Sequence, residues 1–320
     1  MWKIRLFSLI IILTMHMVPV FFISSLPAQD LSSLTERDKI LAFADHLYET
    51  RDYYRAITEY TRFIFLFPSD PFVKIARLKI AFAYQKGEQW SEARQNFESI
   101  GRDYADQEIG REASFQQAET LWLQKDYQQA IQQYRDFIDT FPQDERINNA
   151  FFRTGCIHLE LQQWPEALNS FEHVKPSSRT YVEATSMTKG IKEITSLPLK
   201  KPALAGVLSA VIPGAGQVYA HRYRDGLSAF SVNGGFIWGI VESFQKGQNA
   251  LGGILLFIES GWYAGNIYSA ISSTRRFNKQ KIDTRLGPLL ERCHLSIGSP
   301  GGSSLQEGGV NGLTLNFVYH

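Results

Sequence analysis

The sequence predicts a mainly α-helical protein, built from a helical solenoid, a small helical membrane domain and a short β-like tail. Three observations lead to this prediction. Aromatic and small residues recur at a fixed step between Leu34 and Val174, apolar residues concentrate between Ala203 and Ser273, and the final residues alternate between apolar and polar side chains. The first pattern is typical of stacked helix pairs, the second of membrane helices and the third of strands.

Overall charge and cysteine content exclude two classes of protein. The 33 basic and 32 acidic residues leave a net charge of +1, which gives no electrostatic case for binding nucleic acid. Cys156 and Cys293 are too few for a disulfide framework and lie far apart in the chain. We therefore expect two free thiols.

Residues 1–28 have the order of a secretory signal peptide. Lys3 and Arg5 precede an apolar run from Leu6 to Ile23, and small or turn-forming residues follow up to Ala28. Cleavage near Ala28 is favoured over an uncleaved signal anchor. No cysteine lies near this position, which excludes a lipid anchor there, and the segment that follows is expected outside the cytoplasm.

Residues 34–196 contain four repeats with a period of 37 residues, followed by a capping helix at Tyr181–Ile194. Four columns keep this step in every copy, and we expect all of their residues to pack within and between repeats. The columns are Ala44, Ala81, Ala118 and Gly155; Tyr53, Trp90, Tyr127 and Trp164; Ala56, Ala93, Ala130 and Ala167; and Tyr60, Phe97, Tyr134 and Phe171.

Each copy is predicted to form two antiparallel helices. In the first copy, Tyr53, Ala56 and Tyr60 are three or four residues apart and lie on one helical face, and Pro68 ends that helix. The small column lies on the preceding helix, where it allows the two helices to approach closely. Because one helix pair cannot bury its own apolar face, the copies are expected to stack.

These columns resemble the tetratricopeptide repeat. The step of 37 residues is longer than the usual one and is similar to that of periplasmic members, such as outer-membrane assembly lipoproteins and Tol–Pal coordinator proteins. The resemblance implies a concave surface that binds a protein or peptide partner in its groove. No arrangement of catalytic residues stands out, so we expect neither an enzyme nor a cofactor, and no small-molecule substrate is evident.

Residues 197–285 are predicted to form a helical membrane domain with two or three membrane segments. The stretch VIPGAGQVYAHRYRDG lacks the third glycine of a dinucleotide turn and the Gly-Lys-Ser/Thr of a phosphate loop. Apolar runs rich in glycine, alanine and serine surround it, as in closely packed membrane helices. We therefore expect a break in a membrane segment, which either spans with a kink or is re-entrant. The side of the membrane on which the tail lies is left open, as is the choice of inner or outer membrane.

The same stretch resembles a small bacterial envelope family with the pattern P-G-x-G-Q-x-Y, whose members imply no activity. The pattern is carried by Pro213, Gly214, Gly216, Gln217 and Tyr219, followed by Arg224 in a basic turn and by Gly226.

Three polar residues fall at the expected depth of the lipid, namely Asn233, Glu242 and Glu259. A carboxylate inside a membrane is costly to desolvate and therefore suggests a function. Hydrogen bonding to a neighbouring helix is nevertheless the favoured explanation for Glu259, and snorkelling near a helix end favours it further for Glu242. Residues 286–320 are expected to form a β-hairpin-like tail from HLSIG and GLTLNFVY, joined by a turn-rich segment.

The sequence thus predicts a non-enzymatic scaffold or adaptor of the bacterial cell envelope. A periplasmic solenoid would bind a partner protein or an unfolded chain, and the C-terminal domain would hold it at membrane lipid. The alternative is a component of a membrane transport or protein-insertion system, with a polar path near Glu259 and Asn233.

Overall fold

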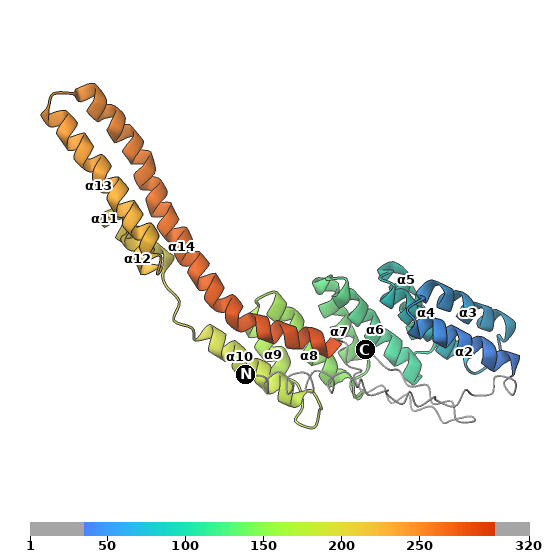
Figure 1. Cartoon of the computed structure of the whole chain (residues 1–320). Coiled ribbons are helices and arrows are strands. Elements are labelled where there is room, and N and C mark those ends of the chain that lie inside the picture. Colours follow the sequence, from blue (N-terminus) through green and yellow to red (C-terminus); the bar gives the residue numbers. More distant parts are fainter. Residues whose placement is uncertain (1–34, 298–320) are drawn as a thin grey trace, which may run out of the picture. The chain divides into compact units, whose positions relative to one another are not determined.

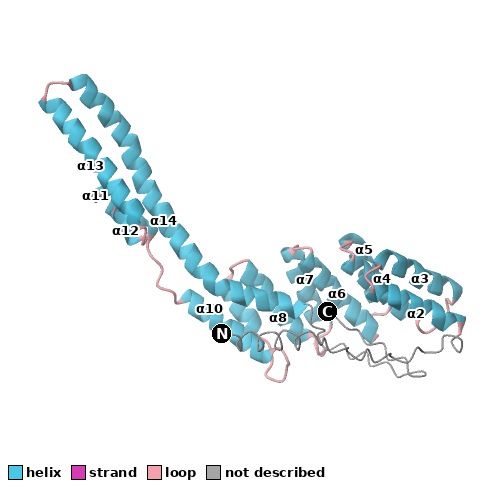
Figure 2. Cartoon of the chain, in the orientation of Figure 1, coloured by secondary structure: helices cyan, strands magenta, loops and turns pink. Residues whose placement is uncertain are grey.

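A computed structural model describes residues 35–297, which divide between two compact units, 35–88 and 89–297. Every regular element of the described residues is a helix (Figure 2). The expected signal peptide, and the tail beyond residue 297, lie outside the described residues.

The first unit contains the first repeat and half of the second. Its helices are α2 (Glu36–Glu49), α3 (Tyr53–Leu66) and α4 (Val73–Lys86). Thr35 and Asp52 cap α2 and α3 because their side chains accept hydrogen bonds from the first-turn amides of Asp38 and Arg55. Helix α3 ends just before Pro68, as the sequence predicts.

The second unit continues the repeats with helices that each pack on the next. They are α5 (Trp90–Asp103), α6 (Glu108–Leu123), α7 (Tyr127–Thr140), α8 (Ile147–Glu160), α9 (Trp164–Glu172) and α10 (Tyr181–Thr195). Their shared core includes Trp122, Tyr134, Phe152 and Ile157.

The turn between the two helices of a copy is the same in all four repeats. Its residue with positive φ is never glycine, yet it recurs every 37 positions, at Arg51, Glu88, Lys125 and Gln162. Each of these residues lies two positions before the aromatic that starts the second helix. A left-handed conformation costs a non-glycine residue about 1–2 kcal/mol, so the packing that follows the turn must offset this cost.

The small column and the second aromatic column are buried, and the fourth copy shows how they pack. The three alanines and Gly155 of the small column are buried, and a Cβ added at Gly155 would lie 2.7 Å from the ring of Phe171. The second alanine column and its aromatic partners are also buried, whereas the first aromatics of the second helices are half-buried. The half-buried residues are Tyr53, Trp90, Tyr127 and Trp164.

The remaining helices form a long hairpin and a bracket at its base (Figure 1). Helix α13 (Tyr223–Gln245) runs antiparallel to the first part of α14 (Asn249–Ile297) and forms the hairpin with it. The bracket consists of α11 (Pro202–Val211) and α12 (Ala215–Tyr219), which pack on α14 near the start of α13. The segment before α11 also follows α14, because Asn278 exchanges two hydrogen bonds with the backbone of Lys200, of 2.9 and 2.7 Å.

The expectation of two or three membrane-crossing segments is not supported. Within residues 35–297, no helix combines the length and the apolar character needed to cross a bilayer. Helix α11 stops after ten residues, before Pro213, and polar residues such as Asn233 and Glu242 interrupt the longer helix α13.

The expectation of a β-like tail starting at residue 286 is wrong for its described part, because α14 continues to Ile297 and includes the expected strand residues His294–Ile297. The alternation in this short stretch is outweighed by a helical spacing. Leu286, Leu289 and Cys293 are three and four residues apart, are all buried, and belong to the core of the repeats. Helix α10 is therefore not a terminal cap, since α14 packs on it.

The expectation of two free thiols is also wrong. Cys156 of α8 and Cys293 of α14 form a disulfide with a Cα–Cα distance of 5.7 Å. Their separation of 137 residues in sequence concealed this pairing, because only the return of α14 to the repeats brings the two residues together.

Ala130 tests the packing of the columns. We predict that Ala130→Leu destabilises α6 and α7 by about 1–3 kcal/mol, because its side chain is fully buried and a leucine would overpack the contact. Hydrogen exchange of the α6 and α7 amides in the full chain measures this loss. The matched control is Gln128→Leu, an exposed position on the same helix. Equal protection in both variants would contradict the assigned register.

Candidate functional site

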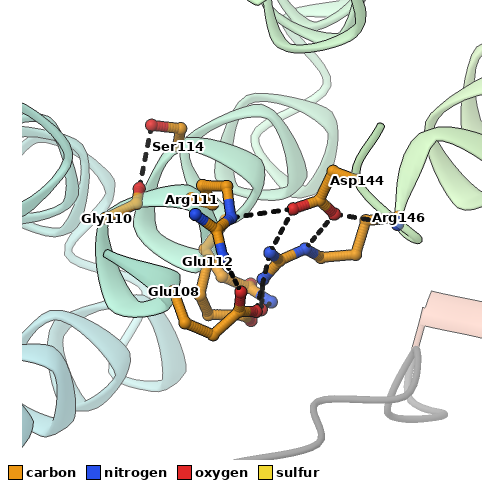
Figure 3. A network of polar contacts seen from close by, with 8 residues as sticks. Glu108, Gly110, Arg111, Glu112, Ser114, Asp144 and Arg146 are labelled. Atoms are coloured by element: carbon orange, nitrogen blue, oxygen red, sulfur yellow. Dashed lines mark hydrogen bonds and ion pairs between the residues drawn. The ribbon is translucent and has the colours of Figure 1, made fainter. Parts of the chain in front are cut away.

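A buried network of charges joins α6 to the start of α8 (Figure 3). The guanidinium of Arg146 has its Nη1 2.7 Å from Glu112 and its Nη2 2.7 Å from Asp144. Arg111 contacts the same Asp144 at 3.1 Å and pairs with Glu108. Two arginines therefore hold three carboxylates. The side chains of Arg146, Glu112 and Asp144 are buried, whereas Arg111 and Glu108 lie at the partly exposed edge.

The ionisation of this network favours its charged form. Burial alone lowers the pKa of Arg146, but the hydrogen bonds that Arg146 donates to Asp144 and the charge of Glu112 more than offset this effect and raise the pKa. Burial likewise opposes ionisation of Asp144, yet Arg146 and Arg111 bring its pKa below the ordinary value. The ion pair of Arg146 with Asp144 thus stays charged at neutral pH and holds the loop between α7 and α8 in place, which is a structural role.

A second polar motif recurs two repeats apart. Tyr60 donates a 2.5 Å hydrogen bond to Asp45, which also pairs with Lys79 at 2.6 Å. The same columns in the third repeat hold Tyr134, Glu119 and Arg153, with distances of 2.5 and 2.9 Å. In this column tyrosine alternates with phenylalanine, which occupies Phe97 and Phe171. This alternation is the sequence signal for the motif, although all four rings were expected only to pack.

The glycines of the P-G-x-G-Q-x-Y stretch allow backbones to touch. Gly214 has a φ of +89°, and a Cβ there would lie 2.0 Å from the carbonyl oxygen of Gly226. A Cβ on Gly216 would lie 2.0 Å from the carbonyl oxygen of Ala205. Pro213 separates α11 from α12, so the stretch is a break between two helices, and larger residues at the glycines would push α11 and α13 away from it.

Gln217 is the central polar residue of this bracket. Its amide nitrogen donates to the backbone and side-chain oxygens of Asn266 at 3.0 and 2.6 Å, and its oxygen accepts from Ser209 at 3.0 Å. One buried side chain thereby joins α11, α12 and α14. The hydroxyl of Tyr219 accepts a 3.2 Å bond from the amide of Lys201. Arg224 is exposed, and Arg222 instead connects the turn to Ser273 of α14 at 3.1 Å.

The three polar residues expected inside lipid have different surroundings. Glu242 is half-buried and pairs with Lys246 at 2.7 Å, near the tip of the hairpin. Asn233 is buried and donates to the carbonyl of Ala229 at 2.6 Å, but its side-chain oxygen has no hydrogen-bond partner. Both carboxylate oxygens of the buried Glu259 also lack one. Asn266, which was not expected from the sequence, is a further buried polar residue of this region.

The hairpin of α13 and the first part of α14 has its polarity reversed relative to the repeats. Its buried positions are occupied by small or polar side chains, among them Asn233, Ser243, Gly252 and Glu259. Its apolar side chains point outward on both helices. The exposed ones include Leu227, Phe230, Ile237, Trp238, Val241, Ile254, Leu256, Phe257 and Trp262.

Neither region has the composition of a metal centre. Within residues 35–297, no group of three histidine, cysteine, aspartate or glutamate side chains could hold a metal ion.

Comparison with known proteins relates the repeats, but not the hairpin, to a family. Residues 78–202, less than half of the chain, match the family described as YfiO, outer membrane lipoprotein. A solved tetratricopeptide repeat protein from Parabacteroides merdae ATCC 43184 is similar with a TM-score of 0.39 and 14% identity, over 80% of this chain and 98% of that chain. No curated protein matches the chain. The similarity to this family therefore covers the helices from α4 to α10 and ends before the hairpin.

Gln217→Leu tests the bracket. We expect this nearly isosteric change to leave the polar groups of Ser209 and Asn266 without their partner, at a cost of about 1–3 kcal/mol. The rate of proteolysis between residues 198 and 225 should then rise about tenfold, since cleavage follows local opening. Gln280→Leu, an exposed position on α14, is the control. If both variants are cleaved at the parent's rate, Gln217 does not hold the helices together.

Proposed function

We propose that this protein is a non-enzymatic adaptor of the cell envelope, in which the repeats bind a partner protein or an unfolded chain and the α13–α14 hairpin inserts into membrane lipid. The reversed polarity of the hairpin is the observation that carries this proposal. A helix pair with apolar side chains outside and polar ones between its helices is suited to lipid rather than to water.

The apolar surface of the hairpin favours insertion into lipid over a contact with a membrane surface or a protein along one side only. The exposed apolar residues follow one another within one or two turns along both helices, as at Ile237, Trp238 and Val241. A helix that lies flat at a membrane surface keeps one polar face. Large exposed apolar patches mark sites that bind another protein or a membrane. Because the apolar residues lie on both helices, lipid, which surrounds an inserted hairpin on all sides, covers them best.

The repeats support the partner-binding half of the proposal. Helical repeats of this type generally bind proteins, and the family that matches residues 78–202 is described as an outer membrane lipoprotein, which supports an envelope location. The polar networks at Asp144 and Glu119 lie inside the repeats and stabilise them, so they leave the outer surface of the helices for recognition.

Flotation with phospholipid vesicles tests the insertion. The parent should float with vesicles of phosphatidylethanolamine and phosphatidylglycerol. Phe257→Glu should lower the protein's partition constant into these vesicles by roughly 70- to 400-fold, because a charged side chain inside lipid costs about 2.5–3.5 kcal/mol. Phe65→Glu on α3 is the matched control, since both phenylalanines are 81% exposed. Equal flotation of the two variants would exclude insertion of the hairpin.

A second function is favoured by one observation, namely the buried polar atoms of Glu259 and Asn233 that lack hydrogen-bond partners. Unpaired polar atoms between two helices are expensive, and such groups mark paths for ions or substrates in membrane domains. In this alternative the hairpin belongs to a transport or protein-insertion element, and the repeats recruit what is moved.

Glu259→Gln separates the two functions. For an adaptor, we expect the variant to float as the parent does, and vesicles that contain either protein should retain a proton gradient read by an enclosed pH-sensitive dye. For a transport element, the parent should dissipate the gradient and the variant should not. Glu242→Gln is the control, since that carboxylate is already paired with Lys246.

A further inference from the structure

The last turns of α14 occupy a surface of the repeats. Leu286, Leu289 and Cys293 are buried there, and they share a core with Met187, Ile191 and Ile194 of α10. Helix α14 thus extends beyond the hairpin, and its last turns pack on α8 and α10 of the repeats.

The receiving surface fits this helix closely. A Cβ on Gly190 would lie 2.8 Å from the side chain of Leu289, so the glycine provides the space for that leucine. The ring of His294 lies 6.4 Å from that of Trp122, and its Nε2 is 3.3 Å from the carboxylate of Glu160. Arg292 donates a 2.9 Å bond to Ser186 of α10. The surface therefore recognises an apolar face at spacings of three and four, flanked by basic side chains.

The docked end is separable from the rest of α14. Pro288 lies inside the helix, where it removes one backbone hydrogen bond, and the exposed Gly287 before it has open space around its Cα. A glycine–proline pair is a natural place for a helix to bend. Beyond this hinge, the covalent bond between Cys156 and Cys293 keeps the end in place.

We propose that the surface under the end of α14 is a binding site for an amphipathic helix of a partner protein, and that the Cys156–Cys293 disulfide keeps it closed until an external dithiol reduces it. This inference rests on the proposed adaptor function and specifies one kind of partner. The partner helix would carry large apolar residues at positions i and i+3, a small one at i+7 and basic residues beside them, as the resident helix does.

The release is a thiol–disulfide exchange. One thiolate of the dithiol attacks a sulfur of the disulfide and forms a mixed disulfide, and the other cysteine leaves as a thiolate that takes up a proton. The second thiol of the dithiol then displaces the remaining cysteine, so that the dithiol is oxidised and Cys156 and Cys293 are both reduced. Because both cysteines are fully buried, the side chains around the disulfide must open locally to admit the dithiol. The end of α14 can bend away at Gly287–Pro288 only after the exchange has broken the bond.

A labelled peptide of residues 282–297 with Cys293→Ser is the probe for the site. In the full chain, the triple variant Leu286→Ser, Leu289→Ser and Cys293→Ser removes the resident helix but leaves the receiving surface unchanged. We expect the peptide to bind this variant about tenfold more tightly than the oxidised parent. Adding Gly190→Leu should abolish the gain, because a side chain there fills the space for Leu289. Equal binding to the triple variant and to the oxidised parent would refute the site.

Dithiothreitol tests the control by the disulfide. The reduced parent and the Cys293→Ser variant should both bind the peptide more tightly than the oxidised parent, and only the parent should respond to the reductant. Hydrogen exchange is the independent measurement if the triple variant fails to fold: reduction of the parent should speed exchange in residues 289–295 and leave α6 and α7 unchanged. No change in either measurement would refute the closure. Vesicle flotation depends on the hairpin and not on this surface, so it reports separately on the adaptor proposal.

Discussion

Close approach of helices at small residues is the constraint on which the structure depends. In the repeats, Gly155 lies under the ring of Phe171, and three alanines take the equivalent positions in the other copies. At the base of the hairpin, Gly214 and Gly216 bring backbone against backbone, and on α10 Gly190 makes room for Leu289. None of the glycine contacts admits a Cβ without displacement of its neighbour. The small residues therefore set the interhelical distance, and the larger side chains fill what remains.

The repeats add polarity to this packing in alternate copies. The acids at Asp45 and Glu119 hold a tyrosine and a cation in the first and third copies, whereas Phe82 with Phe97, and Cys156 with Phe171, occupy the same columns in the second and fourth. The position that binds a cation in one copy thus carries the disulfide in another. The packing columns therefore recur in every repeat, whereas this polar interaction recurs in every second repeat.

The helix pairs could be predicted from the sequence because they depend on local spacing. Ala56 and its equivalents recur four times at the same step, which chance does not readily explain. Sequence reasoning also identified the helix break at Pro213–Gly216 from residue type alone. It did not reach the disulfide, the buried Asn266 or the docking of Leu289, because each requires that α14 run back along the chain to segments far away in sequence. Residues 286–297 of the expected tail were misassigned for the same reason, since a few alternating residues resemble a strand until their helical neighbours find a surface to pack on. The membrane-crossing segments were inferred from composition, which does not separate a crossing helix from one whose apolar side chains are exposed.

Because α14 is continuous, it fixes the distance between the bracket and the repeats. Its 49 residues form a single helix, and at about 1.5 Å per residue the stretch between Ser273, beside the bracket, and Leu286, on the repeats, is about 20 Å long. The preceding chain is fastened along this stretch by Asn278 and Lys281, which bond the backbone of Lys200 and Pro198. A doubled connection of this kind resists both bending and twisting. With the hairpin inserted in lipid as proposed, the stretch from Ser273 to Leu286 would set the height of the last repeats above the bilayer, and only the docked turns beyond Gly287–Pro288 could bend.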